Sequence, residues 1–119
     1  MNDLTQLIDR YIDAWNETDA NRRHDLIART YAEDARYLDP AGQGEGRDGI
    51  GAMIAGVQQR FPGHSFRRTS EVDAHNDRAR FNWELAPADG PPVVRGIDFV
   101  EHADGRLRAV TGFFEPAAA

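Results

Sequence analysis

The first half of the chain repeats its apolar side chains at helical spacing. Between residues 3 and 17 an apolar residue returns every three or four positions, which predicts an amphipathic helix. Asp19 is a typical N-terminal cap for a second helix. The first stripe consists of Leu4, Leu7, Ile8, Tyr11, Ile12 and Trp15, and the second of Leu26, Ile27 and Tyr31.

A third helical stripe follows a short predicted strand at residues 34–39 and a glycine-rich loop at residues 42–46. Pro62-Gly63 would end this helix, because proline cannot continue the hydrogen-bond ladder and glycine favours helix ends. The stripe is formed by Ile50, Met53, Ile54, Val57 and Phe61.

After residue 64 the apolar period changes from helical to alternating, which is typical of strands with one buried face. Asn76-Asp77 and residues 103–105 carry turn residues, and residues 87–92 read as a loop. The strands predicted between them cover residues 66–75, 78–85, 93–102 and 107–114.

Helices followed by antiparallel hairpins indicate an α+β domain with three helices on one face of a curved antiparallel sheet. The 119 residues suffice for one domain, so we expect a single domain over 1–119 with a frayed tail at 116–119. A bent sheet that faces Tyr11 and Trp15 would enclose a mostly apolar pocket with few polar groups, as is usual for small-molecule sites.

Composition narrows the possible partners and chemistry. The absence of cysteine excludes disulfides and thiolate catalysis and suits a cytoplasmic location. A net charge of −6 disfavours nucleic acid as a partner, because phosphate binding needs a basic patch. No run is apolar enough to cross a membrane, and the start does not resemble a signal peptide. The four histidines are scattered without metal-ligand spacing, so we expect neither a metal nor a cofactor.

Two aspartates stand out as candidates for chemistry. Asp39 precedes Pro40, which holds it extended at the end of a strand, on the same face as Tyr37. The residues that share a strand face with Asp98 are Val94, Gly96 and Val100. Such an apolar setting favours the protonated form of a carboxyl group, which can then donate a hydrogen bond.

Two other interpretations fit the sequence less well. Arg95 and Asp98 would form an arginine–aspartate pair of the limonene epoxide hydrolase type, but strand parity puts them on opposite faces. The glycines at 42–46 do not complete a dinucleotide-binding fingerprint, because Arg47 stands at its last glycine position. We interpret this loop as a flexible lip of the pocket.

Three segments carry a resemblance to a known family: residues 10–16, residues 31–42 and residues 93–107. They resemble the nuclear transport factor 2-like superfamily, and within it the ketosteroid isomerases and the SnoaL-like group. The resemblance implies a cone-shaped sheet, a cofactor-independent activity and a homodimer.

By this resemblance, Asp39 is the general base and Tyr11 and Asp98 are the oxyanion donors, with Asp98 kept as a neutral acid. The use of one aspartate as a base and another as a neutral hydrogen-bond donor is a known example from ketosteroid isomerase. Ile54 stands where the isomerases usually carry a tyrosine that supports the catalytic one, and Tyr31 is a possible substitute.

The sequence therefore predicts a pocket enzyme that moves a proton next to a carbonyl group in a small apolar compound, by ketosteroid isomerase-like or polyketide cyclase-like chemistry. The alternative is a non-catalytic ligand-binding or dimerisation module of the same fold, in which each of these residues has a structural role. The expected substrate-binding residues are Trp15, Tyr31, Tyr37, Met53, Ile54, Phe61, Phe81, Trp83, Val100 and Phe113.

Overall fold

The computed structural model describes residues 3–115, so the predicted tail at 116–119 lies outside the described residues. Its helices are α1 (Asp3–Asn16), α2 (Ala20–Thr30) and α3 (Gly46–Arg60). The predicted cap of α2 is present, because the Asp19 carboxylate accepts a hydrogen bond of 2.9 Å from the Arg22 backbone N–H. Within the described residues, no helix is long and apolar enough to span a membrane.

Seven strands form one sheet, in the order β2-β1-β7-β6-β5-β3, and β4 pairs with β5. The strands are β1 (Tyr31–Asp39), β2 (Gly42–Glu45), β3 (His64–Arg68), β4 (Asp73–His75), β5 (Arg78–Pro87), β6 (Val94–Ala103) and β7 (Arg106–Phe114). The α+β class is as the sequence predicted. One strand pair differs, because β1 runs parallel to β7 and the sheet is therefore mixed.

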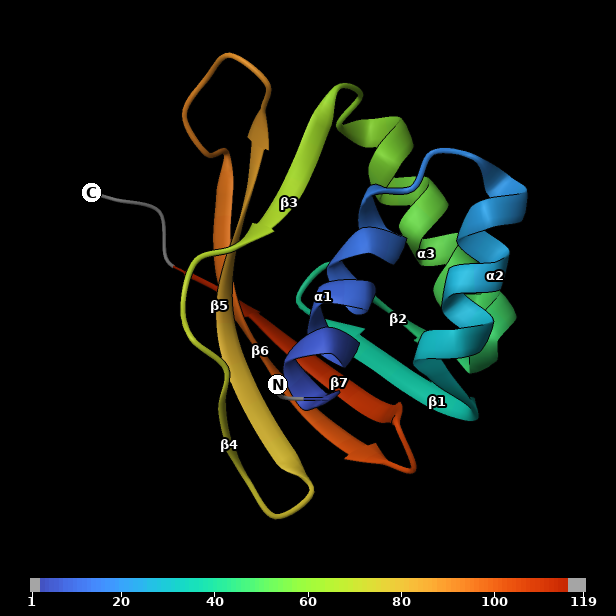
Figure 1. Cartoon of the computed structure of the whole chain (residues 1–119). Helices are drawn as coiled ribbons and strands as arrows, with labels where there is room; N and C mark the ends of the chain where they lie inside the picture. The colour runs from blue at the N-terminus through green and yellow to red at the C-terminus, as the bar shows by residue number, and fades with distance from the viewer. Residues whose placement is uncertain (1–2, 116–119) are drawn as a thin grey trace.

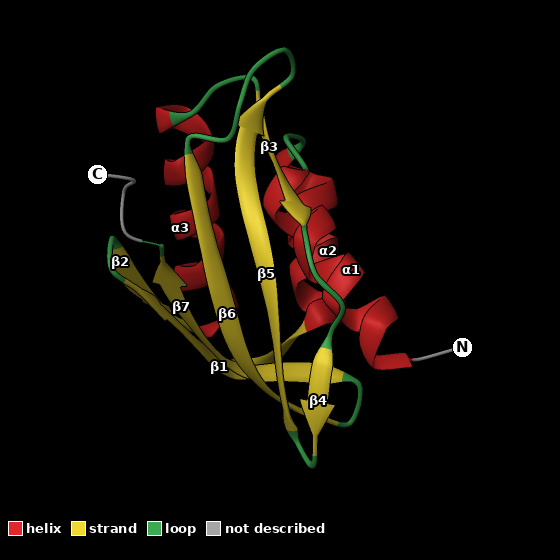
Figure 2. Cartoon of the chain, turned by 90° about the vertical axis from the view of Figure 1, so that its left-hand side faces the viewer, coloured by secondary structure: helices red, strands yellow, loops and turns green. Residues whose placement is uncertain are grey.

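Figures 1 and 2 show all three helices on one side of the curved sheet. The core lies between these two layers and takes Leu7, Ile8, Tyr11 and Trp15 from α1. The other face of the sheet has no helix over it among the described residues.

Three local predictions are corrected by the structure. Tyr31 is extended, with φ −106° and ψ 145°, and it begins β1 instead of ending α2. The lip predicted at 42–46 is not a loop, because residues 42–45 form the strand β2, paired antiparallel with β1, and Gly46 begins α3. The long strand predicted at 66–75 is two strands, β3 and β4, because the chain leaves the strand ladder around Ser70. There the Ser70 hydroxyl accepts a hydrogen bond from the Asn82 backbone N–H.

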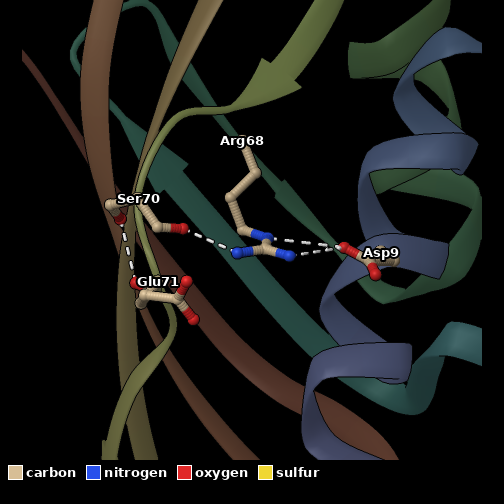
Figure 3. A network of polar contacts seen from close by, with 4 residues as sticks. All are labelled: Asp9, Arg68, Ser70 and Glu71. Carbon is tan, nitrogen blue, oxygen red and sulfur yellow. Dashed lines mark hydrogen bonds and ion pairs between the residues drawn. The ribbon is translucent and has the colours of Figure 1, made fainter.

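Polar contacts around that break attach the sheet edge to α1 (Figure 3). The Arg68 guanidinium at the end of β3 donates to Asp9 on α1 and to the Ser70 carbonyl, at 3.3 Å and 2.6 Å. The Ser70 hydroxyl also donates to the Glu71 carbonyl. Because this edge is held against α1, the space between helices and sheet is bounded on the β3 side.

Candidate functional site

A cavity of about 210 Å³ lies between the helices and the concave face of the sheet. Its walls are mostly aromatic and aliphatic, and its charged side chains are Asp39, Asp98 and Arg60. The lining residues are Tyr11, Ile12, Trp15, Tyr37, Asp39, Ala41, Met53, Val57, Arg60, Phe61, Phe66, Trp83, Leu85, Val94, Asp98 and Phe114. An apolar cavity with few convergent polar groups has the usual composition of a small-molecule site.

Asp98 is the most deeply buried acid of the cavity, with 3% of its surface exposed. It lies on β6 and its side chain faces the helices, as strand parity predicted. Tyr11 on α1 donates a hydrogen bond of 2.7 Å to its Oδ2, and the Trp83 indole on β5 donates one of 2.9 Å to its Oδ1. Both oxygens are thus fixed by donors from two other elements.

Burial raises the pKa of Asp98 to about 7. The hydrogen bonds from Tyr11 and Trp83 lower this pKa, whereas the negative charge of Asp39 raises it. Burial, with the Asp98 charge as a further cause, holds the pKa of Tyr11 well above its usual value. At neutral pH the site therefore holds a neutral tyrosine beside a carboxyl group that is close to its midpoint of titration.

Asp39 is half-buried at the end of β1, where the sequence placed it. Its Oδ2 accepts a hydrogen bond of 2.6 Å from the Tyr37 hydroxyl. Its Oδ1 accepts bonds of 2.8 Å and 3.1 Å from the backbone N–H groups of Ala41 and Gly42. Asp39 thus organises the β1–β2 turn and also lines the cavity, so its position is consistent with a structural role and with a chemical one.

Gly112 on β7 brings the two carboxyl groups together. It pairs with Asp98 across the β6–β7 ladder. A Cβ atom at this position would lie 2.8 Å from Asp98 Oδ1 and 3.3 Å from Asp39 Cβ. The absence of a side chain here is what allows an acid from β1 and an acid from β6 to converge on one end of the cavity.

Aromatic rings continue the wall away from the acids. Trp15 packs against Tyr37 and Phe66, with ring centroids 5.3 Å apart in both pairs. Trp83 lies 5.6 Å from Phe66 and 5.9 Å from Phe114. The Trp15–Tyr37 pair is tilted and the other three pairs are edge-on, and this packing fixes the rings in the apolar part of the cavity.

Eight of the residues predicted for catalysis or substrate binding line the cavity. They are Tyr11, Asp39, Asp98, Trp15, Tyr37, Met53, Phe61 and Trp83.

The remaining five lie elsewhere. Tyr31, Ile54, Phe81 and Val100 are buried in the core, where Tyr31 and Phe81 pack behind the Tyr11 ring at 6.0 Å and 5.9 Å. Phe113 is 54% exposed on the outer face, because Gly112 takes the inward position on β7. Tyr31 supports Tyr11 through ring packing, whereas the hydroxyl of Tyr11 bonds to Asp98.

Sequence reasoning missed half of the lining residues: Ile12, Ala41, Val57, Arg60, Phe66, Leu85, Val94 and Phe114. Strand parity could have found Leu85, which shares its face with Trp83, and Val94, which shares its face with Asp98. Helical spacing could have found Arg60, seven residues after Met53 on α3.

The described part of the chain, residues 3–115, contains no group of three or more histidine or acidic side chains that could hold a metal ion. The polar groups of the side chains that line the cavity are two carboxyl groups, two tyrosine hydroxyls, two indole N–H groups and a guanidinium. This set can accept a proton at one point and donate hydrogen bonds at another, which is what enolisation of a carbonyl compound requires.

Comparison with known proteins relates this chain to a family. A candidate isomerase of the SnoaL-like family from Agrobacterium tumefaciens is 40% identical, with a TM-score of 0.91 over 98% of this chain and 100% of that one. A candidate ketosteroid isomerase from Kribbella flavida is 26% identical, with a TM-score of 0.72 over 96% of this chain and 78% of that one.

A candidate polyketide cyclase from Sinorhizobium meliloti shares the fold at 17% identity, with a TM-score of 0.72 over 94% of this chain and 99% of that one. Among curated proteins, none matches the sequence. The sequence model of the SnoaL-like domain matches residues 8–110, which include Tyr11, Asp39 and Asp98. This chain belongs to the SnoaL-like domain family.

Proposed function

We propose that the protein is a cofactor-independent enzyme that moves a proton next to the carbonyl group of a small, mostly apolar compound. Asp39 is the general base, and Tyr11 and Asp98 donate hydrogen bonds to the carbonyl oxygen. The observation that carries this proposal is the convergence of Asp39 and Asp98 at Gly112, in a cavity that is otherwise mostly apolar. The likeness to a candidate isomerase at 40% identity supports it.

The two acids have different tasks in the proposed reaction. A substrate whose carbonyl oxygen enters beside Asp98 takes a hydrogen bond from the protonated Asp98 and one from the Tyr11 hydroxyl, whose single proton turns from Asp98 Oδ2 to the substrate oxygen. The Asp39 carboxylate then removes the proton from the adjacent carbon, and the electron pair of that C–H bond moves to the carbonyl oxygen as an enolate. The two donors stabilise this oxyanion, and half-buried Asp39, whose proton exchanges with solvent, then protonates the same or a conjugated carbon.

The size of the cavity favours a small substrate. Its volume of about 210 Å³ is below the range of roughly 300–1,000 Å³ in which drug-sized ligands bind. We therefore expect a ketone with one or two rings, or an equivalent chain, to fit better than a four-ring steroid.

Hydrogen exchange at carbon tests this function without knowledge of the natural substrate. Cyclic enones and aryl ketones, with an unsaturated steroid ketone for comparison, are incubated in D2O and followed by proton NMR. The proposal expects catalysed exchange next to the carbonyl in wild type, loss of it in Asp39→Asn, and full activity in Asp25→Asn, whose exposed carboxylate lies on α2 away from the cavity. Equal exchange in wild type and Asp39→Asn, or none in either, would contradict it.

A non-catalytic binding module is the second candidate, and one observation favours it. Both oxygens of Asp39 already accept hydrogen bonds, from Tyr37 and from the turn backbone, as expected for a purely structural aspartate. This candidate predicts saturable binding of the same ketones that persists in Asp39→Asn, without any exchange. The NMR experiment therefore separates the two functions.

We also propose a homodimer, as the family resemblance implies, in the cytoplasm, which the lack of cysteine suits. The uncovered face of the sheet supports dimerisation through Leu38, Phe99 and Phe113, which are 50%, 41% and 54% exposed. Light scattering of wild type and Phe113→Asp tests the dimer. A monomer for both proteins would contradict it.

A further inference from the structure

Arg60 is the cation among the described residues that line the cavity. It lies in the last turn of α3, and Met53, Val57 and Arg60 follow one another at i, i+4 and i+7 along the cavity face of that helix. The position is therefore set by the same helical stripe that supplies the apolar wall.

The guanidinium of Arg60 has no hydrogen bond or ion pair with any residue between 3 and 115. Other arginines near α3 differ in this respect. Arg47 donates twice to the Tyr31 carbonyl, and Arg23 donates to the Glu17 carbonyl and the Gln58 amide. Arg60 is an exposed residue of the cavity lining, and no described side chain of the protein neutralises its positive charge.

The distance between Arg60 and the two aspartates can be derived along two walls of the cavity, the helix α3 and the strand β6. Met53 lies at the acid end, since its Cε is 3.5 Å from the position of a Cβ on Gly42, next to the Asp39 turn. Arg60 comes seven positions after Met53, which corresponds to a rise of about 10 Å along α3.

On the sheet wall, the lining runs four residues along β6 from Asp98 to Val94, or about 13 Å. Val94 on β6 pairs with Leu85 on β5. Two residues after Leu85, Pro87 pairs with His64 at the start of β3, shortly after α3 ends. Figure 1 also shows the end of α3 beside the start of β3. Both walls therefore lead from the acids to the end where Arg60 stands.

We propose that the ligand of this cavity is an elongated apolar carbonyl compound with an anionic group, of carboxylate type, about 10 Å from the carbonyl oxygen. The anionic group pairs with Arg60 while the carbonyl lies between Tyr11 and Asp98. An arginine fork matches a carboxylate in shape and charge, and the apolar wall between excludes a second charge. This inference rests on the proposed function and adds the class of substrate to it.

A pair of rigid probes tests the inference. 6-Hydroxy-2-naphthoate places a hydroxyl, which imitates the enolate oxygen, and a carboxylate at opposite ends of a flat two-ring body. 6-Hydroxy-2-naphthamide has the same shape without the charge. Binding of both is measured by calorimetry at low and at physiological ionic strength, with wild type, Arg60→Gln and Arg29→Gln.

Arg29 is the matched control, because it is an exposed arginine in the last turn of α2 and does not line the cavity. Any general effect of a cation at a helix end is therefore present in both arginine variants. We expect wild type and Arg29→Gln to bind the carboxylate about tenfold more tightly than the amide, with a smaller difference at higher salt. Arg60→Gln should bind both probes equally, with an unchanged thermal midpoint.

Equal affinity of wild type for the two probes would overturn the inference, and so would an Arg60→Gln variant that keeps the preference, or binding of neither probe. The proposed proton-transfer function is tested independently of this substrate class. If neutral ketones exchange their protons in an Asp39-dependent way while Arg60→Gln changes nothing, the catalytic proposal holds and the anionic substrate class is wrong.

Discussion

Asp39 and Asp98 lie at the same end of one cavity, yet their surroundings differ. Asp39 is half-buried and accepts hydrogen bonds from a tyrosine and two backbone N–H groups. Asp98 is almost fully buried and accepts one from Tyr11 and one from Trp83. Burial favours the neutral form of Asp98 and outweighs these two hydrogen bonds. The difference teaches how one cavity can hold a base and an acid of the same residue type.

Replacing each acid by its amide gives the largest contrast. Asp39→Asn removes the base, so we expect the rate of hydrogen exchange to fall by about 10³-fold. Asp98→Asn retains an N–H donor beside Tyr11, so its rate should fall by only about tenfold to a hundredfold. The measurement is the NMR exchange assay with both variants. Equal losses would remove the division of tasks between the two residues.

The stability of the protein should also distinguish the two acids. Because the native pKa of Asp98 is about 7 and the ordinary value is 3.8, the native state retains a proton that the unfolded chain releases between these values. The free energy of unfolding should therefore fall as pH rises from about 4 to 7, by on the order of 1 kcal/mol per pH unit.

Urea unfolding at several pH values measures this slope. Asp98→Asn should lose the contribution, and Asp25→Asn on the exposed surface of α2 should keep it. A slope that survives unchanged in Asp98→Asn would mean that another group is responsible.

Gly112 sharpens the comparison because it touches both acids. In Gly112→Ala the new methyl group would lie 2.8 Å from Asp98 Oδ1, so we expect a loss of about 1–3 kcal/mol in unfolding free energy and a slower exchange. Gly56→Ala is the matched control, since a Cβ there meets nothing within 4 Å. It should stabilise α3 by about 0.5–1 kcal/mol. Denaturant titrations of the two variants should change in opposite directions.

Tyr37 gives the smallest expected effect. Tyr37→Phe removes the 2.6 Å bond to Asp39 Oδ2 but leaves the two backbone donors on Oδ1. We expect kcat to fall about tenfold with little change in KM, because the variant loses orientation of the base and keeps the cavity wall. A change in KM alone would indicate that Tyr37 only contacts the ligand.

The sequence predicts much of this architecture because periodicity reports burial directly. The stripe of α1 placed Tyr11 and Trp15 on the cavity side, and alternation on β6 placed Asp98 among apolar neighbours. The strand end at Asp39 followed from Pro40.

The missing parts depend on contacts between distant elements. Alternation divides β7 into two faces but does not say which face is inward, so Phe113 was predicted for the cavity in place of Phe114. The role of Gly112 depends on the register of β7 against β6 and on how close the end of β1 comes to β7. No local sequence pattern encodes either contact. The parallel β1–β7 pair is likewise a long-range choice.

We expect Asp98 to keep its proton in a large fraction of the molecules at neutral pH, although it lies near Asp39. A carbon-13 NMR titration of the aspartate carboxyl groups tests this most directly, with Asp98→Asn to identify the signal. We expect that signal to titrate near pH 7. A midpoint near the ordinary value of about 4 would contradict it, because Asp98 would then be charged at neutral pH and unable to donate a hydrogen bond.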